Sequence, residues 1–198
     1  MRSMGPKVYS VDGVTPVIYP GAFVHPDAVL IGDVIVEDGC YIGPFASLRG
    51  DFGRIIVRQG SNVQDSCILH TGPDSDLIIE ANGHIGHAAV VHGAHLAANV
   101  LIGMNAVIMD HARIGESAII GAMSFVKAGA EIPAGHLATG VPARVVRQLS
   151  ADDRAWKLGA TKKYQELARR CLASLRPAEP LTHLDATRSR VDGDRSFT

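Results

Sequence analysis

The chain of 198 residues is apolar but poor in large side chains: 46% of its residues are hydrophobic, 5% are aromatic and 20% are charged. This composition excludes an intrinsically disordered chain, which combines low hydrophobicity with high net charge. The formal net charge of −1 excludes the basic surface typical of proteins that bind nucleic acid or anionic membranes. The length suits one folded domain with an appendage.

The cysteines and the N-terminal residues indicate in which cellular compartment the protein is expected. Cys40, Cys67 and Cys171 are odd in number and far apart, which favours a reducing compartment over a disulfide framework. Residues 1–9 lack the apolar core of a secretory signal peptide. Residues 81–109 contain no Asp, Glu, Lys or Arg, but four histidines and four glycines interrupt them, so a membrane span is not predicted. We therefore expect a cytoplasmic protein with neither a nucleic acid nor a membrane partner.

Aliphatic residues recur every six positions through most of the chain, and the residue four places later is nearly always small. Hexapeptide repetition is typical of a parallel β-helix, in which three short strands complete a coil and the aliphatic side chains fill its interior. We predict a lead-in at 1–22 and an all-β parallel β-helix at 23–140; ordinary sandwich strands would show turns every 8–12 residues. The repeat comprises Val24, Leu30, Val36, Ile42, Leu48, Val57, Val63, Leu69, Ile79, Ile85, Val91, Leu96, Ile102, Ile108, Ile114, Ile120, Val126 and Ile132.

Two breaks in the repeat and a helical segment complete the predicted elements. The breaks, at 52–56 and 71–77, predict loops that leave the solenoid, where functional residues are common. Ser150, followed by Asp152 and Asp153, predicts a helix start, and a polar tail is expected at 177–198. The predicted helix, 150–176, packs outside the β-helix through an apolar stripe of Trp156, Ala160, Tyr164, Leu167, Cys171 and Leu175.

Three histidines share a geometry that suits a metal ion. His70 and His92 occupy the same position of the repeat one coil apart, so they should stack on one face, about 4.8 Å apart at the backbone. Such a pair can converge on one zinc ion, whose bonds to imidazole nitrogen are about 2.0–2.1 Å long. His87 lies near a corner and should point away from the pair within one subunit. Around a threefold axis it can approach the pair of an adjacent subunit, which leaves the fourth zinc position open for water.

Four short motifs resemble the gamma-class carbonic anhydrase family: Arg49-Gly50-Asp51, Asn62-Val63-Gln64-Asp65, His70, and Ile85-Gly86-His87 with His92-Gly93. The resemblance implies a homotrimer of left-handed β-helices with zinc, or Fe²⁺ or Co²⁺, between subunits. It implies that His70, His87 and His92 are the metal ligands. It further implies that Asn62 and Gln64 place the bound water and the substrate. Arg49, Asp51 and Asp65 would join the subunits.

Within that family the chain is more similar to the phenylacetic acid degradation protein and the carnitine-operon protein group, in residues 47–55, 103–107 and the helix around Trp156. In shorter family members a tyrosine of the C-terminal helix often reaches the site. This makes Tyr164 a candidate catalytic residue, although packing within the stripe explains it equally well. The acidic loop with a glutamate proton shuttle has no counterpart at 71–76 except Asp74 and Asp76.

These features predict a metal-dependent hydrolase that uses a zinc-bound hydroxide, because zinc lowers the pKa of bound water to about 7. The narrower resemblance implies an acyl-CoA thioesterase of phenylacetate or carnitine catabolism, with Gln64 as a hydrogen-bond donor. A gamma-class carbonic anhydrase, hydrating carbon dioxide at the same site, is the first alternative. The others are a hexapeptide acyltransferase with His84, His95 or His111 as general base, and a non-catalytic scaffold subunit.

Overall fold

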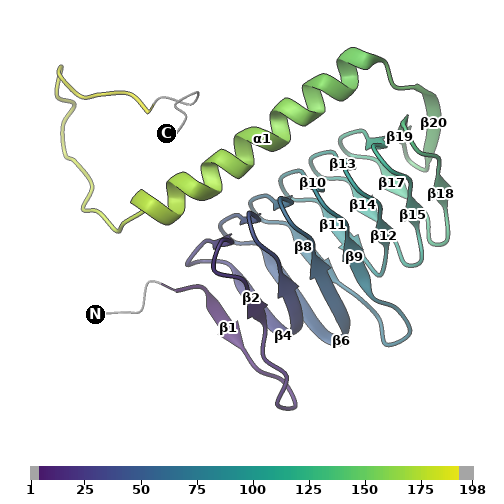
Figure 1. Ribbon diagram of the computed structural model, residues 1–198, viewed down its shortest axis with the longest axis horizontal. Helices are drawn as coiled ribbons and strands as arrows, with labels where there is room; N and C mark the ends of the chain where they lie inside the picture. The colour runs from purple at the N-terminus through teal and green to yellow at the C-terminus, as the bar shows by residue number, and fades with distance from the viewer. Residues whose placement is uncertain (1–4, 192–198) are drawn as a thin grey trace.

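A computed structural model describes residues 5–191 and shows a left-handed parallel β-helix with one long helix lying along its outside (Figure 1). The strands form two sheets. The twelve-stranded sheet contains β1 (Lys7–Tyr9), β2 (Val17–Ile18), β4 (Val29–Val36), β6 (Ser47–Val57), β8 (Ile68–His70), β9 (Leu77–Ile79), β11 (Val90–His92), β12 (His95–Leu96), β14 (Val107–Ile108), β15 (Arg113–Ile114), β17 (Phe125–Val126) and β18 (Glu131–Ile132). The eight-stranded sheet contains β3 (Phe23–Val24), β5 (Tyr41–Ile42), β7 (Asn62–Val63), β10 (His84–Ile85), β13 (Leu101–Ile102), β16 (Ile119–Ile120), β19 (His136–Gly140) and β20 (Ala143–Gln148).

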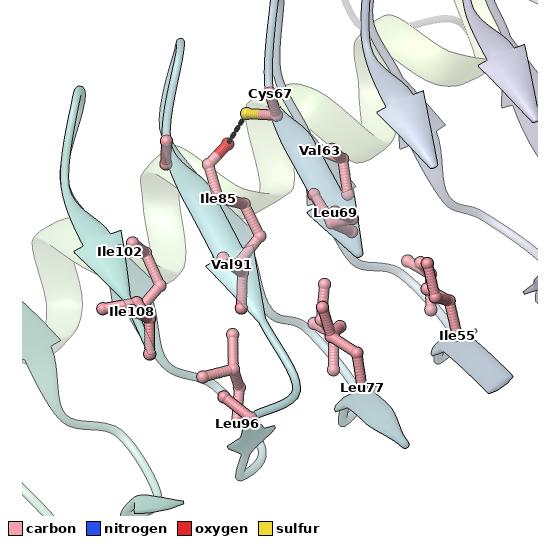
Figure 2. Packing of buried hydrophobic residues seen from close by; sticks show 14 of the residues in the cluster. Ile55, Val63, Cys67, Leu69, Leu77, Ile85, Val91, Leu96, Ile102 and Ile108 are labelled. Carbon is pink, nitrogen blue, oxygen red and sulfur yellow. Dashed lines mark hydrogen bonds between the residues drawn. The ribbon is translucent and has the colours of Figure 1, made fainter. Parts of the chain in front are cut away.

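The interior of the solenoid confirms the six-residue repeat. Repeat residues such as Leu69, Val91 and Ile108 are fully buried and stack from coil to coil, as Figure 2 shows. The residues four places after the aliphatic ones, including Ala89 and Ala106, are fully buried as well. Small side chains at those positions let the chain turn close to the axis. The narrow interior therefore explains the low aromatic content.

The first coil begins earlier than the predicted boundary at residue 23. Strand β1 pairs with β4 from Lys7↔Val29 to Tyr9↔Ile31, and β2 pairs with the second half of β4. These strands lie in the segment expected to be a lead-in. Their side chains are largely exposed, so the six-residue hydrophobic pattern is absent there although the backbone pairing continues. Residues 1–4 of that prediction lie outside the described part of the chain.

One of the two predicted loops is wrong. Residues 52–56 belong to β6, an eleven-residue strand that pairs with β8 through its first half and with β9 through its second. Here the chain passes from one face to the next without a corner, beside the equally continuous β4. The second break is a turn, where Thr71 Oγ1 lies 2.5 Å from the Ser75 carbonyl oxygen. Only this break carries the chain away from the strands.

The helix α1 (Ala151–Ser174) starts where the sequence predicted. Ser150 Oγ accepts a hydrogen bond from the Asp153 backbone N–H at 3.1 Å, and the Ser150 N–H donates to the Asp153 carboxylate at 2.7 Å. This reciprocal pair is a capping box. The helix runs antiparallel to the order of the coils and packs against β3, β5 and β7 (Figure 1).

The predicted apolar stripe is only half right. The C-terminal half of α1 buries Ala168, with Tyr164 and Leu167 beside it, against Phe23 and Tyr41. In the N-terminal half, Trp156 is 64% exposed, whereas Lys157 and Thr161 are 2% exposed. The corner of the β-helix beneath this half presents oxygen atoms: Lys157 Nζ donates to Asn82 O at 2.7 Å and to Asn99 Oδ1 at 2.6 Å. Polar side chains therefore hold this half in place, which an apolar periodicity could not reveal.

The remaining features concern the cysteines and the C-terminal segment. All three cysteines are free. The Cys40 and Cys67 thiols are buried, and burial raises the pKa of each to about 12, so they behave as small apolar side chains. Residues 177–191 contain no helix or strand, and residues 192–198 of the predicted tail lie outside the described chain. Over residues 5–191, no helix has the length and hydropathy needed to cross a bilayer.

Candidate metal centre and the groove beside α1

His70 and His92 stand side by side on neighbouring strands. They are register partners in the β8–β11 pair, as their shared repeat position predicted. His70 Nδ1 lies 3.0 Å from His92 Nε2, and both side chains are partly exposed. The facing nitrogens are therefore close enough to bind a single ion.

A carboxylate holds the other nitrogen of each ring. Asp51 Oδ1 lies 3.0 Å from His70 Nε2, and Asp110 Oδ1 lies 2.5 Å from His92 Nδ1. Arg49 Nη1 donates to both oxygens of Asp51 at 2.9 and 2.7 Å. Although burial opposes it, hydrogen bonds from Arg49 and His70 hold the pKa of Asp51 below its usual value. We call Asp51, His70, His92 and Asp110 the histidine-pair half-site.

The protonation of this half-site tests whether it fits a metal ion. A neutral imidazole carries one N–H, and a carboxylate accepts but does not donate. With both rings neutral and each N–H directed at its carboxylate, His70 Nδ1 and His92 Nε2 present lone pairs to each other across 3.0 Å. Two facing lone pairs repel unless a cation lies at them. Carboxylates behind metal-ligating histidines are the usual arrangement in metalloproteins, so these residues fit a divalent ion.

His87 does not join the pair within one chain. It lies in the corner after β10, where its Nδ1 is 3.3 Å from Asp65 and its Nε2 is 3.4 Å from the Tyr164 hydroxyl. Within residues 5–191 of a single chain, no group of three or more His, Cys, Asp or Glu side chains is arranged to hold a metal ion. Burial raises the pKa of Tyr164 to about 12, so its hydroxyl keeps its proton at neutral pH.

Asn62, Gln64 and His84 form a buried network next to His87. Gln64 Nε2 lies 2.9 Å from Asn62 Oδ1 and 2.8 Å from His84 Nε2. His84 Nδ1 is 3.2 Å from Asn62 Nδ2 and 3.4 Å from the buried Thr161 hydroxyl. Burial, followed by the charge of Lys157, lowers the pKa of His84 to about 4. We call Asn62, Gln64, His84, His87 and Tyr164 the amide half-site.

The network limits what Gln64 can do. Its amide has two N–H groups; in this orientation one donates to Asn62 Oδ1, and the other donates to His84 Nε2 in the tautomer that protonates His84 at Nδ1. The oxygen Oε1 is then the amide atom that retains hydrogen-bonding capacity, and it accepts rather than donates. Donation of a hydrogen bond by Gln64 to the substrate remains a prediction.

A groove of about 490 Å³ opens between α1 and the eight-stranded sheet, beside the amide half-site. We call it the helix groove. Its floor is a row of stacked glycines, Gly86, Gly103 and Gly121, and its walls include Leu101 and Ile119 of the sheet and Trp156 and Ala160 of the helix. Gln64, His84, His87 and Tyr164 line it as well. Apolar walls with a few convergent polar groups are typical of small-molecule sites.

The structure places the predicted site residues in two separate groups and adds one residue, Asp110. It brings Arg49 and Asp51 to His70, and Asp65 to His87, all within one chain. Asp110 was not identified from the sequence; its only signal was a carboxylate about one coil after His92. His84, first considered as a transferase base, is instead part of the buried network. His95 pairs with Glu80 at 3.5 Å, and His111 lies exposed in another corner.

Comparisons with known proteins agree with this architecture. A hexapeptide family described as "Bacterial transferase hexapeptide (six repeats)" matches residues 15–50 and 93–128. The carnitine operon protein CaiE of Salmonella agona is 54% identical over 185 residues, which are 93% of each chain. CaiE of Escherichia coli K12 is 53% identical over 190 residues, covering 96% of this chain and 97% of the relative.

Two solved structures share both fold and sequence with the chain. A Bacillus cereus protein, provisionally described as an acetyltransferase, superposes with a TM-score of 0.84 at 36% identity, covering 85% of this chain and 98% of that one. A hexapeptide transferase family protein from Anaplasma phagocytophilum gives a TM-score of 0.79 at 31% identity, covering 82% and 96%. The chain has the six-residue repeat and the β-helix, and it is 54% identical to CaiE of Salmonella agona over 93% of its length. It therefore belongs to the hexapeptide-repeat family that includes the carnitine operon protein CaiE.

Proposed function

We propose that this protein is a metal-dependent acyl-CoA thioesterase whose site is completed between the subunits of a homotrimer. The observation that carries the proposal is the histidine pair, in which His70 Nδ1 and His92 Nε2 lie 3.0 Å apart while carboxylates contact the outer ring nitrogens. His70 and His92 of one subunit and His87 of the next would hold the ion. A bound divalent ion of the zinc class, with Fe²⁺ or Co²⁺ as alternatives, supplies Lewis acidity and makes water acidic near neutral pH.

The residues of the amide half-site would position the reactants. Gln64, with its amide nitrogen directed at Asn62 Oδ1 and His84 Nε2, would accept a hydrogen bond from the attacking water through Oε1 and so orient it. Asn62 and His84 would keep that amide in place. Tyr164, whose hydroxyl stays protonated, would donate a hydrogen bond to the thioester carbonyl oxygen, where negative charge develops. Hydrolysis then divides the thioester into a carboxylic acid and free CoA.

Acyl transfer to an acceptor other than water is the second candidate. The family description and the two related structures, one provisionally an acetyltransferase, favour it more directly than they favour hydrolysis. The histidines considered as general bases argue against it. His84 has a pKa of about 4 and both ring nitrogens in contact with polar groups, and neither His95 nor His111 is among the residues that line the helix groove.

Carbon dioxide hydration would use the same ligands and remains a prediction. Its rate would depend on proton export, and the turn at 71–76 provides only Asp74 and Asp76, of which Asp76 accepts a hydrogen bond from the Arg54 backbone N–H. The name of the CaiE relatives favours an acyl-CoA of carnitine catabolism as the substrate; a phenylacetate-derived thioester is the alternative.

The proposal is tested by metal content and thioester hydrolysis measured on the same preparation. We expect about one zinc-class ion per chain, because a trimer has as many interfaces as chains, together with release of free CoA from acyl-CoA. His92→Ala should abolish metal binding and lower kcat/KM by more than about 100-fold, since losing even the carboxylate behind a ligand costs about 10–100-fold.

His95→Ala is the matched control, because this histidine pairs with Glu80 outside both half-sites; it should keep metal and activity. Thioester hydrolysis that survives His92→Ala would contradict the proposal. CoA release that requires an amine or hydroxyl acceptor would establish the transferase instead. Hydration of carbon dioxide without thioester cleavage would establish the carbonic anhydrase.

A further inference from the structure

We infer that the helix groove binds the acyl group of the substrate, and that its walls select acyl chains longer than acetyl. This inference rests on the proposed function and assigns its substrate class. The groove is defined by Gly103, Leu101, Ile119, Trp156 and Ala160, with Gln64 at its polar end.

The glycine row creates the space. Ile85, Ile102 and Ile120 are register partners that point into the core, so the residue after each of them faces outward toward α1. All three are glycines, and a Cβ on Gly103 would meet the Ala122 backbone nitrogen at 2.4 Å. The close approach of successive coils thus requires glycine and leaves a trough without side chains under the helix. The walls of this trough are the side chains of Leu101 and Ile119 on one side and of α1 on the other.

The position of the groove connects it to the proposed chemistry. Gln64, His87 and Tyr164 line it, so a chain lying along the glycine row ends with its carbonyl group beside the residues proposed to orient water and polarise the thioester. The groove has about 490 Å³, within the usual range for small-molecule pockets. Carbon dioxide, with three atoms, would leave most of it unfilled. An extended acyl chain would displace water from the apolar walls, which is favourable by about 0.8 kcal/mol for each CH₂ buried.

The test uses the single tryptophan of the chain, which lines the groove while remaining 64% exposed. The probes are S-alkyl-CoA thioethers, which water cannot cleave, added to the intact protein. S-hexyl-CoA should shift the Trp156 emission saturably, whereas free CoA and S-methyl-CoA should not. Ala160→Phe, which fills the groove from the helix, should weaken S-hexyl-CoA binding about tenfold, the effect of losing the burial of about two CH₂ groups.

Ala155→Phe is the matched control. Ala155 is exposed on the same helix, so this variant should bind S-hexyl-CoA like the wild type. Leu101→Ala, which widens the groove, should shift the preference toward longer chains. Light scattering on each variant checks that the oligomer is unchanged.

Three results would overturn the inference. One is an unchanged emission of Trp156 on S-hexyl-CoA binding, and another is equal weakening by Ala155→Phe and Ala160→Phe. The third is dissociation of the oligomer by Ala160→Phe, which would identify the groove as a subunit contact. These binding results do not depend on turnover. A saturable emission shift without release of CoA would refute the proposed reaction but support the acyl site. Release of CoA without an emission shift would refute only the acyl site.

Discussion

The histidine-pair half-site and the amide half-site differ in how their polar groups are satisfied. In the first, carboxylates contact the outer ring nitrogens, and the two inner nitrogens lie 3.0 Å apart. In the second, neutral amides, a neutral imidazole and a protonated tyrosine hold one another, largely buried beneath α1. In the proposed function the first half-site is completed by a cation, whereas the second is held together by its own hydrogen bonds.

This difference indicates a division of labour. Charge is concentrated where an ion would bind, and neutral hydrogen-bonding groups are concentrated where a thioester and water would lie. Because the two half-sites lie on different faces of one chain, the proposed site requires two subunits. The following predictions test the division, beginning with the largest expected effect.

Mixed trimers test whether the half-sites meet between subunits. His87→Ala and His92→Ala should each be inactive alone, because each removes one ligand type from every interface. Trimers co-assembled from equal amounts of the two should regain about one quarter of the wild-type CoA release, since one interface in four then combines two intact half-sites. If both half-sites acted within one chain, the mixture would stay inactive.

Asp110→Asn tests the carboxylate behind His92. The amide cannot accept the Nδ1 proton as strongly, so the ring loses orientation and basicity, and zinc affinity measured by competition with a chelator should fall about 10–100-fold. Asp74→Asn provides the comparison, because Asp74 lies exposed in the turn at 71–76 and its replacement should leave zinc affinity unchanged. An equal loss in both variants would contradict a role specific to Asp110.

The neutrality of His84 predicts an acid-labile amide half-site. The pKa of His84 is about 4 when folded and about 6.5 when unfolded, so the unfolded chain binds more protons between these values. The contribution of His84 to stability is complete above about pH 6.5 and is lost as the pH falls toward 4; between pH 7 and pH 5 it amounts to about 2 kcal/mol.

Chemical unfolding at the two pH values measures this loss. His84→Gln, which keeps a hydrogen-bonding side chain without a titrating group, should show a pH dependence smaller by that amount. An equal pH dependence of stability in His84→Gln and the wild type would contradict the role of His84 in the acid lability.

The smallest effect is expected at Trp156, the exposed residue of the predicted stripe. Trp156→Phe should change the free energy of unfolding by no more than about 0.5 kcal/mol, as exposed substitutions usually do. Lys157→Met should cost about 1–3 kcal/mol, because it removes the charged donor that Asn82 O and Asn99 Oδ1 have beneath the helix. Equal effects in thermal unfolding would contradict the polar docking of this half of α1.

Much of the fold was predictable because one repeating unit dictates it. Counting strands from Leu69 to Val91 was sufficient to place His70 beside His92, since register in a β-helix follows directly from the six-residue period. It also separated His87 from the pair. The predicted start of the β-helix was wrong at β1 and β2, where the hydrophobic period is absent. Backbone pairing continues there without the buried aliphatic side chains that reveal the repeat in the sequence.

The site was less predictable because hydrogen bonds between distant residues leave no periodic signal. Asp110 and His92 are on successive coils, and Lys157 contacts Asn82, 75 residues away. The charge state of His84 depends on what covers it, and that cover is α1. Such features require the packed structure, whereas the placement of His70 beside His92 followed from register.

The helix α1 has a consequence for how the protein can change in length. Its 24 residues extend about 36 Å, and the stack of seven parallel strands from β3 to β19 extends about 29 Å. The helix is therefore long enough to span the whole stack. Each further coil, 18 residues as from Ile102 to Ile120, would lengthen the stack by about 4.8 Å, or about three helical residues. Insertion of whole coils beyond β14 should therefore be tolerated when the helix grows in step, with both half-sites left in register.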